Sequence, residues 1–353
     1  MLTAWHDYLR SQHAAIAAPA PALDGVPGAP ARIIGFGDPD RELAAADRGA
    51  VACPLTDWTA MTVAGPDSTA FLHGQFTNDV AGLAVGAVHY NGYCSPKGRM
   101  LAGFPLARTA DAEYLLAVPA DIAPPLVRRL RMFVLRSKVV VTPLEHTHVC
   151  IGIAGTAGAV SAVPPAVRLE AGATVLGLPD GRALTVCPVA MARACWEQAA
   201  SAATPVGSPV WDWLAIRAGV PVITAATQDK FIPQMLNFEL IGGVSFQKGC
   251  YPGQEIVARM QYLGKLKERL YRAHVAAAET VAPGTSLFGA QFGDQACGTI
   301  VNAAPAPGGG HDLLAVIQIA SAQSDSIRLA HAAEAPVLAL LALPYIVPAA
   351  QAR

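Results

Sequence analysis

The chain has 353 residues, of which 53% are apolar and 14% charged, and its formal net charge is -1. This composition excludes an intrinsically disordered protein, and the length suggests two or three packed domains. The near-neutral charge argues against a generally basic nucleic-acid binder, although a local basic patch is compatible with it.

The first half of the chain predicts a mixed α+β architecture. Residues 1–45 hold one short helical segment and an Ala/Pro/Gly-rich stretch, so we expect a poorly ordered leader. Residues 46–148 predict strands, a hairpin around the turn Pro96-Lys97-Gly98-Arg99 and one amphipathic helix. The expected strands are 58–63, 89–95, 100–106, 114–118 and 139–141, and the expected helix is 126–134.

The second half predicts two further units. Residues 149–204 repeat the α+β style more weakly, with strands near 149–154 and 182–188 and a helix around 191–200. Residues 205–263 return to the first unit with helices at 211–218 and after Pro252. From 264 to 353, short apolar runs separated by Gly, Pro and Asp predict a small C-terminal β-barrel, ending in a buried strand within 337–346.

The number and spacing of cysteine and histidine residues limit the disulfide and metal sites that the chain can form. The seven cysteines are scattered and include no C-x-x-C pair, which disfavours a disulfide framework and a closed zinc site. His146 and His148 would share a strand face, yet no acidic or thiol group completes a metal site. No convincing secretory signal or membrane span is present, so we expect a cytoplasmic protein without a bound metal.

One segment stands out, because Cys250 lies between Lys248 and the start of a predicted helix at Pro252-Gly253. A neighbouring cation and the positive end of a helix both favour a thiolate, as expected of a reactive cysteine. Glu255 opposes this effect. The alternative is a structural turn in which Cys250 is a small buried hydrophobe.

The phrase Lys248-Gly249-Cys250-Tyr251-Pro252-Gly253-Gln254-Glu255, followed by Arg259, resembles the signature of the folate-binding YgfZ family. These proteins are relatives of the aminomethyltransferase (T-protein) of the glycine cleavage system. Further segments are similar to family landmarks in the expected order. They are 74–80 (GQFTNDV), 96–99 (PKGR), 134–139 (VLRSKV), 219–223 (GVPVI) and 231–234 (FIPQ).

The resemblance implies a cloverleaf of domains around a central opening that holds tetrahydrofolate. Residues 46–148 and 205–263 would form the folate-binding core, with 149–204 as a lobe packed against it. Family members support iron–sulfur enzymes and the tRNA modifications those enzymes perform, without a firmly attached turnover reaction. We therefore expect a folate-binding protein that assists assembly or repair of iron–sulfur enzymes, with Cys250 facing the folate cavity.

One departure weakens the transferase alternative. The transferases carry an acidic pair shortly after the glycine turn, whereas this chain has Met100-Leu101-Ala102-Gly103 there and lacks that general acid/base. Asp79 is the nearest substitute and is expected to serve a local turn. Two rivals stay open, namely a folate-dependent aminomethyl or methyl transferase and a folate-binding scaffold with a structural cysteine.

The remaining site candidates have a role in folate binding or in structure. Lys248 would meet the thiol or a folate glutamate, and Tyr251 would stack on the pterin or fill the core. Gln254 and Glu255 would open the helix or bind ligand, while Gln234 and Asn237 offer amides to a pterin edge.

Two further stretches of the sequence are rich in arginine and lysine. One holds Arg128, Arg129, Arg131, Arg136 and Lys138, and the other Arg259, Lys265, Lys267, Arg269 and Arg272. Tail binding is favoured for the second, and an ordinary solvated face is at least as good an account of the first. These basic stretches are also compatible with contact to iron–sulfur partner proteins. Direct tRNA contact has weaker support, because few aromatic residues lie among the basic ones.

Overall fold

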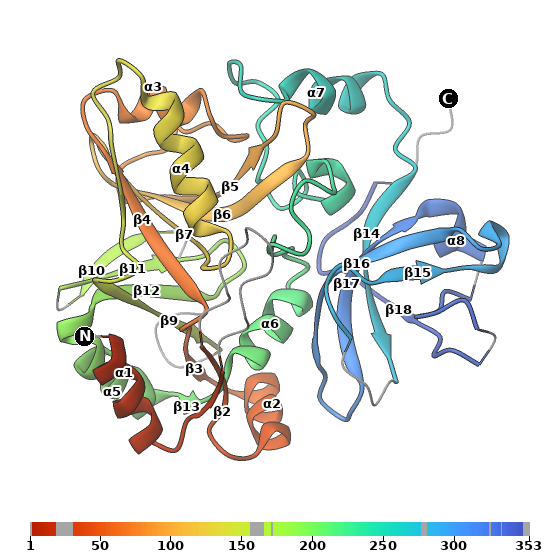
Figure 1. Ribbon diagram of the computed structural model, residues 1–353, viewed down its shortest axis with the longest axis horizontal. Coiled ribbons are helices and arrows are strands. Elements are labelled where there is room, and N and C mark those ends of the chain that lie inside the picture. The colour runs from red at the N-terminus through yellow and green to blue at the C-terminus, as the bar shows by residue number, and fades with distance from the viewer. Residues whose placement is uncertain are drawn as a thin grey trace.

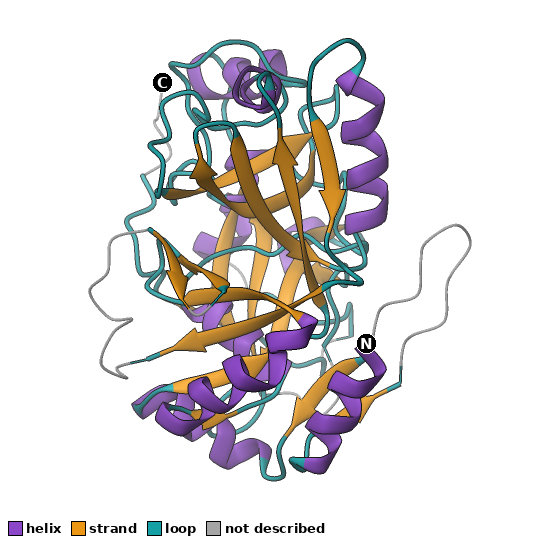
Figure 2. Ribbon diagram, turned by 90° about the vertical axis from the view of Figure 1, so that its left-hand side faces the viewer, coloured by secondary structure: helices purple, strands orange, loops and turns teal. Residues whose placement is uncertain are grey.

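The computed structural model describes residues 2–18, 31–155, 166–170, 172–276, 281–324, 326–332 and 334–348. Three larger sheets organise this part of the chain, and Figure 1 shows them as three lobes. In Figure 2 the strands fill the middle of the molecule and the helices lie toward its outside. The predicted mixed helix-and-strand architecture is therefore confirmed.

The first sheet has the strand order β5-β6-β7-β4-β8, all antiparallel. Its strands are β4 (Trp58–Ala64), β5 (Val88–Cys94), β6 (Met100–Ala110), β7 (Glu113–Pro119) and β8 (Val140–Pro143). Helices α3 (Ser68–His73) and α4 (Ala123–Val134) pack on it through a shared apolar cluster. The predicted turn joins β5 to β6, with Ser95 N donating to Arg99 O at 2.8 Å.

The second sheet has the order β10-β11-β12-β9-β3-β13, in which only β3 and β13 pair in parallel. Its strands are β3 (Val51–Pro54), β9 (His148–Ala154), β10 (Val167–Glu170), β11 (Ala173–Gly177), β12 (Ala183–Pro188) and β13 (Thr204–Pro205). The 3-10 turn η1 (Val189–Met191) leads into α5 (Ala192–Ala202), which covers this sheet.

The expectation of a poorly ordered leader is wrong for residues 2–18 and 31–45. They form α1 (Leu2–Ser11), the pair β1 (Ala15–Ala17) and β2 (Arg32–Gly35), and the start of α2 (Pro39–Arg48). Trp5 and Leu9 are buried in one cluster with Trp196 of α5, and Phe36 stacks on Trp196. A few large apolar side chains thus outweigh the Ala/Pro/Gly-rich composition, whose central part, 19–30, lies outside the described residues.

The third sheet has the order β15-β16-β17-β14-β18. Its strands are β14 (Glu268–Val275), β15 (Ser286–Phe288), β16 (Ala296–Pro305), β17 (His311–Gln318) and β18 (Ala339–Leu341), with η3 (Ala290–Phe292) and α8 (Ile319–Ser324) beside them. Single bridges run from Phe288 to Arg328 and on to Val337, but the described strands do not close a barrel. The final strand is shorter than predicted, since prolines 336 and 344 flank β18. The expected burial of this strand is wrong, because all three residues of β18 are exposed at the edge of the sheet.

Helix α6 (Ser208–Arg217) lies between the second sheet and the C-terminal sheet (Figure 1). Trp211 contributes to the main apolar cluster, and Trp213 Nε1 donates to Asp312 Oδ2 of β17 at 3.1 Å. A helix buried on nearly all sides is typical of the centre of a large fold. The main cluster contains residues of all three larger sheets, so the lobes share one core.

Candidate functional site

Two glycine turns that are far apart in sequence pack directly against each other. Gly98 (φ +70°) follows β5, and Gly253 (φ +80°) precedes α7 (Gln254–Tyr262). A Cβ on Gly253 would lie 2.4 Å from Ser95 O, and one on Gly98 would lie 2.9 Å from Ile256 Cβ. Both positions require glycine because of backbone angle and space, so the Pro96–Arg99 turn and the cysteine turn form one unit.

Residues 74–80 fix the loop that leads to the cysteine. Thr77 Oγ1 donates to Gly243 O at 2.6 Å, and Ser245 N donates to Thr77 O at 3.0 Å. Asn78 Nδ2 donates to Gly242 O at 2.7 Å. Residues 74–80, which resemble a family landmark, therefore hold the backbone of residues 242–245 in place.

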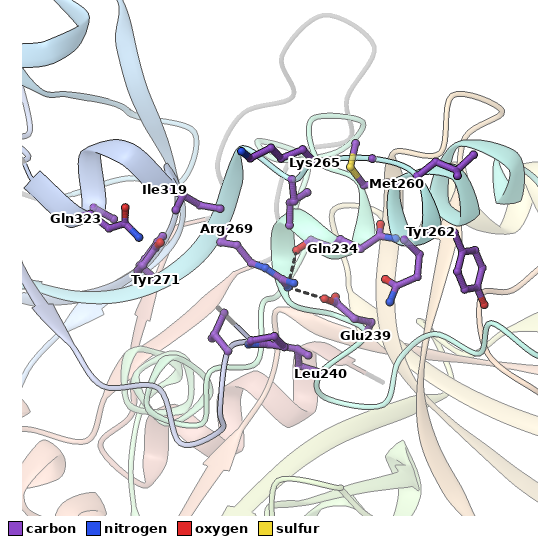
Figure 3. Close-up of a pocket in the computed structure, with 17 residues that line it drawn as sticks. Gln234, Glu239, Leu240, Met260, Tyr262, Lys265, Arg269, Tyr271, Ile319 and Gln323 are labelled. Atoms are coloured by element: carbon purple, nitrogen blue, oxygen red, sulfur yellow. Dashed lines mark hydrogen bonds and ion pairs between the residues drawn. The ribbon is translucent and has the colours of Figure 1, made fainter. Parts of the chain in front are cut away.

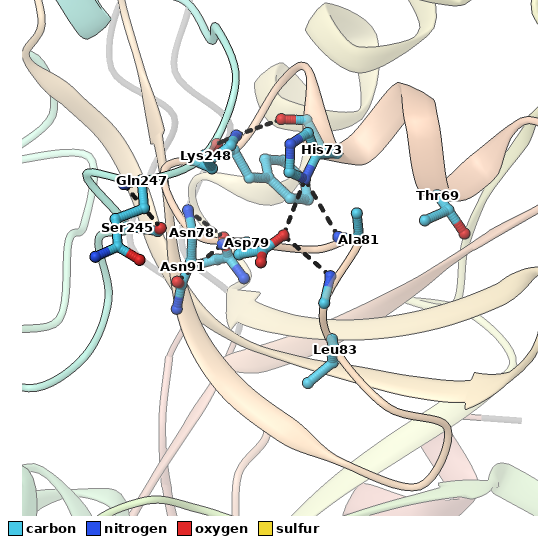
Figure 4. Close-up of polar contacts among 12 residues, drawn as sticks. Thr69, His73, Asn78, Asp79, Ala81, Leu83, Asn91, Ser245, Gln247 and Lys248 are labelled. Atoms are coloured by element: carbon cyan, nitrogen blue, oxygen red, sulfur yellow. Dashed lines mark hydrogen bonds and ion pairs between the residues drawn. The ribbon is translucent and has the colours of Figure 1, made fainter.

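Lys248 is half-buried beside the end of α3 (Figure 4). Its ammonium donates to His73 O and, at 2.6 Å, to Phe76 O, and it lies 4.9 Å from the centre of the Tyr251 ring. Burial lowers the pKa of Lys248 to about 8, although Asp79 and Cys250 oppose this. Lys248 thus anchors the loop and keeps a cation near the thiol.

Cys250 is exposed, whereas five other cysteines are buried and Cys195 is partly buried. It lies in an irregular segment four residues before α7. The alternative in which Cys250 is a small buried hydrophobe is therefore wrong. The neighbouring Tyr251 is 7% exposed, and burial raises its pKa.

A histidine that sequence reasoning missed lies beside this loop. His73 Nδ1 accepts from Ala81 N at 3.2 Å and lies 3.3 Å from Asp79 Oδ1 (Figure 4). Burial, followed by the charge of Lys248, lowers the pKa of His73, and Asp79 opposes the shift. Asp79 Oδ1 also accepts from Gly82 N at 3.0 Å, which confirms the predicted turn role.

A cavity of about 900 Å³ opens at the other end of α7 (Figure 3). The end of α7, the following loop, the start of β14, α8 and the C-terminal segment contribute to its wall. Its lining residues are Gln234, Glu239, Leu240, Met260, Gln261, Tyr262, Leu263, Gly264, Lys265, Leu266, Arg269, Tyr271, Ile319, Ala322, Gln323, Val347 and Pro348. Lys248, Cys250 and Tyr251 are not among these.

A buried ion pair forms the polar part of this cavity. Arg269 Nη1 lies 2.5 Å from Glu239 Oε1 and donates to Asn237 Oδ1 at 3.0 Å. Glu239 Oε2 and Gln234 Oε1 are buried without a hydrogen-bond partner. Burial raises the pKa of Glu239, and Arg269 opposes the shift.

The two predicted amide residues have structural contacts as well. Gln234, in the 3-10 turn η2 (Pro233–Leu236), donates through Nε2 to Val257 O of α7 at 2.7 Å. Asn237 donates through Nδ2 to Leu270 O at 3.0 Å. Gln234 therefore links α7 to the cavity wall, while its carbonyl oxygen is buried without a partner.

The remaining predicted site residues lie along α7 and its exit. Gln254 begins the helix, and Glu255 and Arg259 are exposed on it, outside the cavity lining. In the second basic stretch, Arg269 pairs with Glu239 and Arg272 with Asp312, so these two are not solvated charges. Sequence reasoning missed Glu239, whose only signal was its place two residues after Asn237.

A second, much smaller cavity of about 20 Å³ lies beside Gly103. It is lined by Trp58, Tyr90, Gly103, Phe104, Pro105, Leu178, Arg182, Leu184, Trp211, Val220, Pro221, Val222 and Phe238. Arg182 lies 4.4 Å from the centre of the Trp211 ring and pairs with Asp180 at 2.7 Å. This space holds about one water molecule.

Among the described residues, no helix is long and apolar enough to cross a bilayer. In the same part of the chain, no cluster of three or more His, Cys, Asp or Glu side chains is arranged to hold a metal ion.

Comparisons with known proteins agree with this architecture. A family model described as the GCVT N-terminal domain matches residues 36–162. The tRNA-modifying protein YgfZ of Shigella sonnei (strain Ss046) is 34% identical over 228 residues, which cover 62% of this chain and 69% of that protein. The protein of the same name from Escherichia coli (strain K12) matches to the same extent.

Among solved structures, the glycine cleavage system aminomethyltransferase T of Bartonella henselae is similar, with a TM-score of 0.74 and 15% sequence identity. The match covers 97% of each chain. At this identity the likeness shows a T-protein-like fold.

Proposed function

Because the chain belongs to the family of the tRNA-modifying protein YgfZ, we propose that it binds tetrahydrofolate and assists iron–sulfur enzymes, including those that modify tRNA. The observation that carries the folate part is the 900 Å³ cavity with two buried, unpaired acceptors, Gln234 Oε1 and Glu239 Oε2. Unpaired buried acceptors cost free energy that a ligand with matching donors recovers.

Tetrahydrofolate fits this donor–acceptor arrangement. The amino-pyrimidinone edge of its pterin presents N–H donors, which suit a carboxylate and an amide oxygen. The volume lies within the range of about 300–1,000 Å³ that is usual for ligand sites. Lys265, at the cavity wall, supplies a cation for the anionic glutamate tail. Bound there, the folate supplies a carrier for one-carbon units.

Cys250 serves a different contact in this proposal. Helix α7 has nine residues, so its two ends lie about 13 Å apart. The thiol precedes one end of the helix, and the cavity is built around the other. We therefore propose that the exposed thiol meets an iron–sulfur client or assembly protein transiently, rather than the folate itself. A single thiol is a poor permanent anchor for a cluster, which usually takes about four ligands.

Folate titration tests the cavity. Isothermal calorimetry with 5-formyltetrahydrofolate should give one site per chain, and Glu239→Gln should weaken binding at least about tenfold. Glu255→Gln is the matched control, because Glu255 is an exposed carboxylate on α7 outside the cavity lining, and it should bind folate like the wild type. Equal affinity of Glu239→Gln and the wild type would contradict this folate site, and no binding of folate by the wild type would contradict the cofactor itself.

Complementation of a strain lacking the family member tests the cysteine. Cys250→Ala should fail to restore iron–sulfur enzyme activity, whereas Cys195→Ala, the partly buried control, should restore it. Full rescue by Cys250→Ala would show that the thiol has only a structural role, and it would favour the folate-binding scaffold.

The transferase alternative has its own assay. The position where transferases carry carboxylates contains Gly103, and the adjoining small cavity presents aromatic groups and Arg182. Without a general acid/base at the folate nitrogen, we expect no turnover with tetrahydrofolate and an aminomethyl donor. Measurable turnover would favour the transferase.

A further inference from the structure

The C-terminal end of α4 presents apolar side chains to solvent instead of burying them. Leu126, Val127 and Leu130 pack into the core of the first sheet. Beyond them, Met132 is 67% exposed, Leu135 85% and Val140 64%. With Phe133, these residues form what we call the α4 apolar patch, defined as Met132, Phe133, Leu135 and Val140. Exposed apolar groups close together mark contact surfaces more often than isolated ones do.

The backbone at the centre of the patch is also unusual. Leu135 has a φ of +46° and a ψ of −105°, a combination that is unfavourable for a leucine and readily adopted by glycine. Neither local backbone preference nor burial therefore explains a leucine here. The Leu135 side chain is 85% exposed and is therefore accessible to a partner.

Two grooves meet at Met132, one of the four residues of the patch. A cavity of about 290 Å³ is lined by Tyr93, Leu101, Pro125, Leu126, Arg128, Arg129, Met132 and Gln228. Another, of about 520 Å³, is lined by Pro124, Val127, Arg128, Arg131, Met132, Pro143 and Glu145. Arg128 and Met132 belong to both, so they form a ridge between two hollows that side chains of a partner could enter.

The charges around the patch are predominantly positive. Arg128, Arg131, Arg136 and Lys138 are exposed, and Arg131 is oriented by donation to Val141 O at 2.8 Å. Of the nearby carboxylates, Glu145 lines one groove, and Asp67 accepts from Lys138 N at 2.7 Å. The surface complements an anionic partner.

We infer that the α4 apolar patch and its basic rim dock an acidic, amphipathic segment of another protein. Carboxylates of such a segment pair with the rim arginines, while its apolar side chains cover Leu135 and enter the grooves. RNA fits less well, since phosphates gain nothing from exposed aliphatic groups and the patch offers only Phe133 for base stacking. A lipid surface would not fill two concave grooves.

A peptide-binding experiment tests this inference independently of folate. The probe is a fluorescein-labelled amphipathic helix with Leu at positions i, i+3, i+4 and i+7 and Glu elsewhere on its flanks. Anisotropy should show saturable binding to the full chain that weakens with added salt. A scrambled peptide of equal composition should bind at least about tenfold more weakly, because it lacks the apolar stripe.

Leu135→Gly is the decisive variant. Glycine adopts a φ of +46° with a ψ of −105° without strain, so this variant should be at least as stable as the wild type and yet bind the peptide about tenfold more weakly. Leu169→Gly is the matched control, because Leu169 is 79% exposed on a different lobe, and it should bind like the wild type.

Three results with the peptide would overturn the inference. They are no saturable binding of the peptide, equal binding of the scrambled peptide, and equal affinity of Leu135→Gly and the wild type. Transfer RNA or vesicles of anionic phospholipid should bind wild type and Leu135→Gly alike or not at all. A loss of either interaction in Leu135→Gly would also overturn the inference and would assign the patch to RNA or to membrane instead.

Discussion

The structure allows a clear estimate of how much the Arg269–Glu239 ion pair contributes to the free energy of unfolding. In Arg269→Met, Glu239 loses the partner at 2.5 Å, and the two side chains are only 15% and 8% exposed. Breaking a buried pair on one side costs about 3–5 kcal/mol, because an uncompensated charge stays buried. We expect a loss of unfolding free energy of about this size at pH 8, measured by urea denaturation.

The pH dependence of this loss follows from Glu239. Burial already raises its pKa above the value of an unfolded chain, and Arg269 opposes that rise, so the variant should have a still higher pKa. The folded variant then binds a proton more readily than the unfolded chain. The loss of unfolding free energy in Arg269→Met is complete at pH values above the pKa of Glu239 in the folded variant. It decreases as the pH falls toward about 4.5, the pKa of a glutamate in the unfolded chain. The deficit should therefore be smaller at pH 5 than at pH 8.

A second substitution serves as the control. Adding Glu239→Gln to Arg269→Met removes the buried charge and should recover a large part of the lost stability. A deficit under about 1 kcal/mol at pH 8, as for solvent-exposed pairs, would refute the reasoning, as would a deficit that does not change with pH.

Three further changes probe the cysteine turn. Gly253→Ala should cost about 2 kcal/mol or more in urea denaturation, because its Cβ would lie 2.4 Å from Ser95 O, whereas Gly242→Ala, with nothing within 4 Å at a similar φ, should cost less. Between about pH 8 and 10.5 the contribution of Lys248 to stability should rise with pH, since folded Lys248 has a pKa of about 8 and binds fewer protons there than it does in the unfolded chain. The stability difference between the wild type and Lys248→Met should therefore shift in favour of the wild type over this range, and a difference that does not change with pH would contradict the assignment. In limited iodoacetamide labelling followed by mass spectrometry, Cys250 should be modified before the six less exposed cysteines, and saturating folate should leave its rate unchanged.

Local sequence signals predicted most of the elements of the fold. The hairpin at 96–99, the helix stopped at Gly219 and the helix after Gly253 were identified because turn and cap chemistry acts over a few residues. The leader was misjudged because Trp5 and Leu9 are stabilised by Trp196, about 190 positions away. The described strands of the C-terminal sheet do not close the expected barrel, because the local sequence pattern does not specify how edge strands pair.

The site could be predicted only in part for a similar reason. Exposure of Cys250 agrees with its turn, but the chain pattern placed Cys250, Gln234 and Asn237 in one group. Helix α7 instead separates the thiol from the cavity that Gln234 lines. Glu239 could be identified as a site residue only from its contact with Arg269. This contact depends on the packing of β14 against η2, which the local sequence does not specify.

A crystal structure of the complex with 5-formyltetrahydrofolate tests the central claim most directly. We expect pterin density within hydrogen-bonding distance of Glu239 Oε2 and Gln234 Oε1, with Cys250 free of the ligand. Pterin density outside this cavity, or in contact with the Cys250 thiol, would contradict the proposed site.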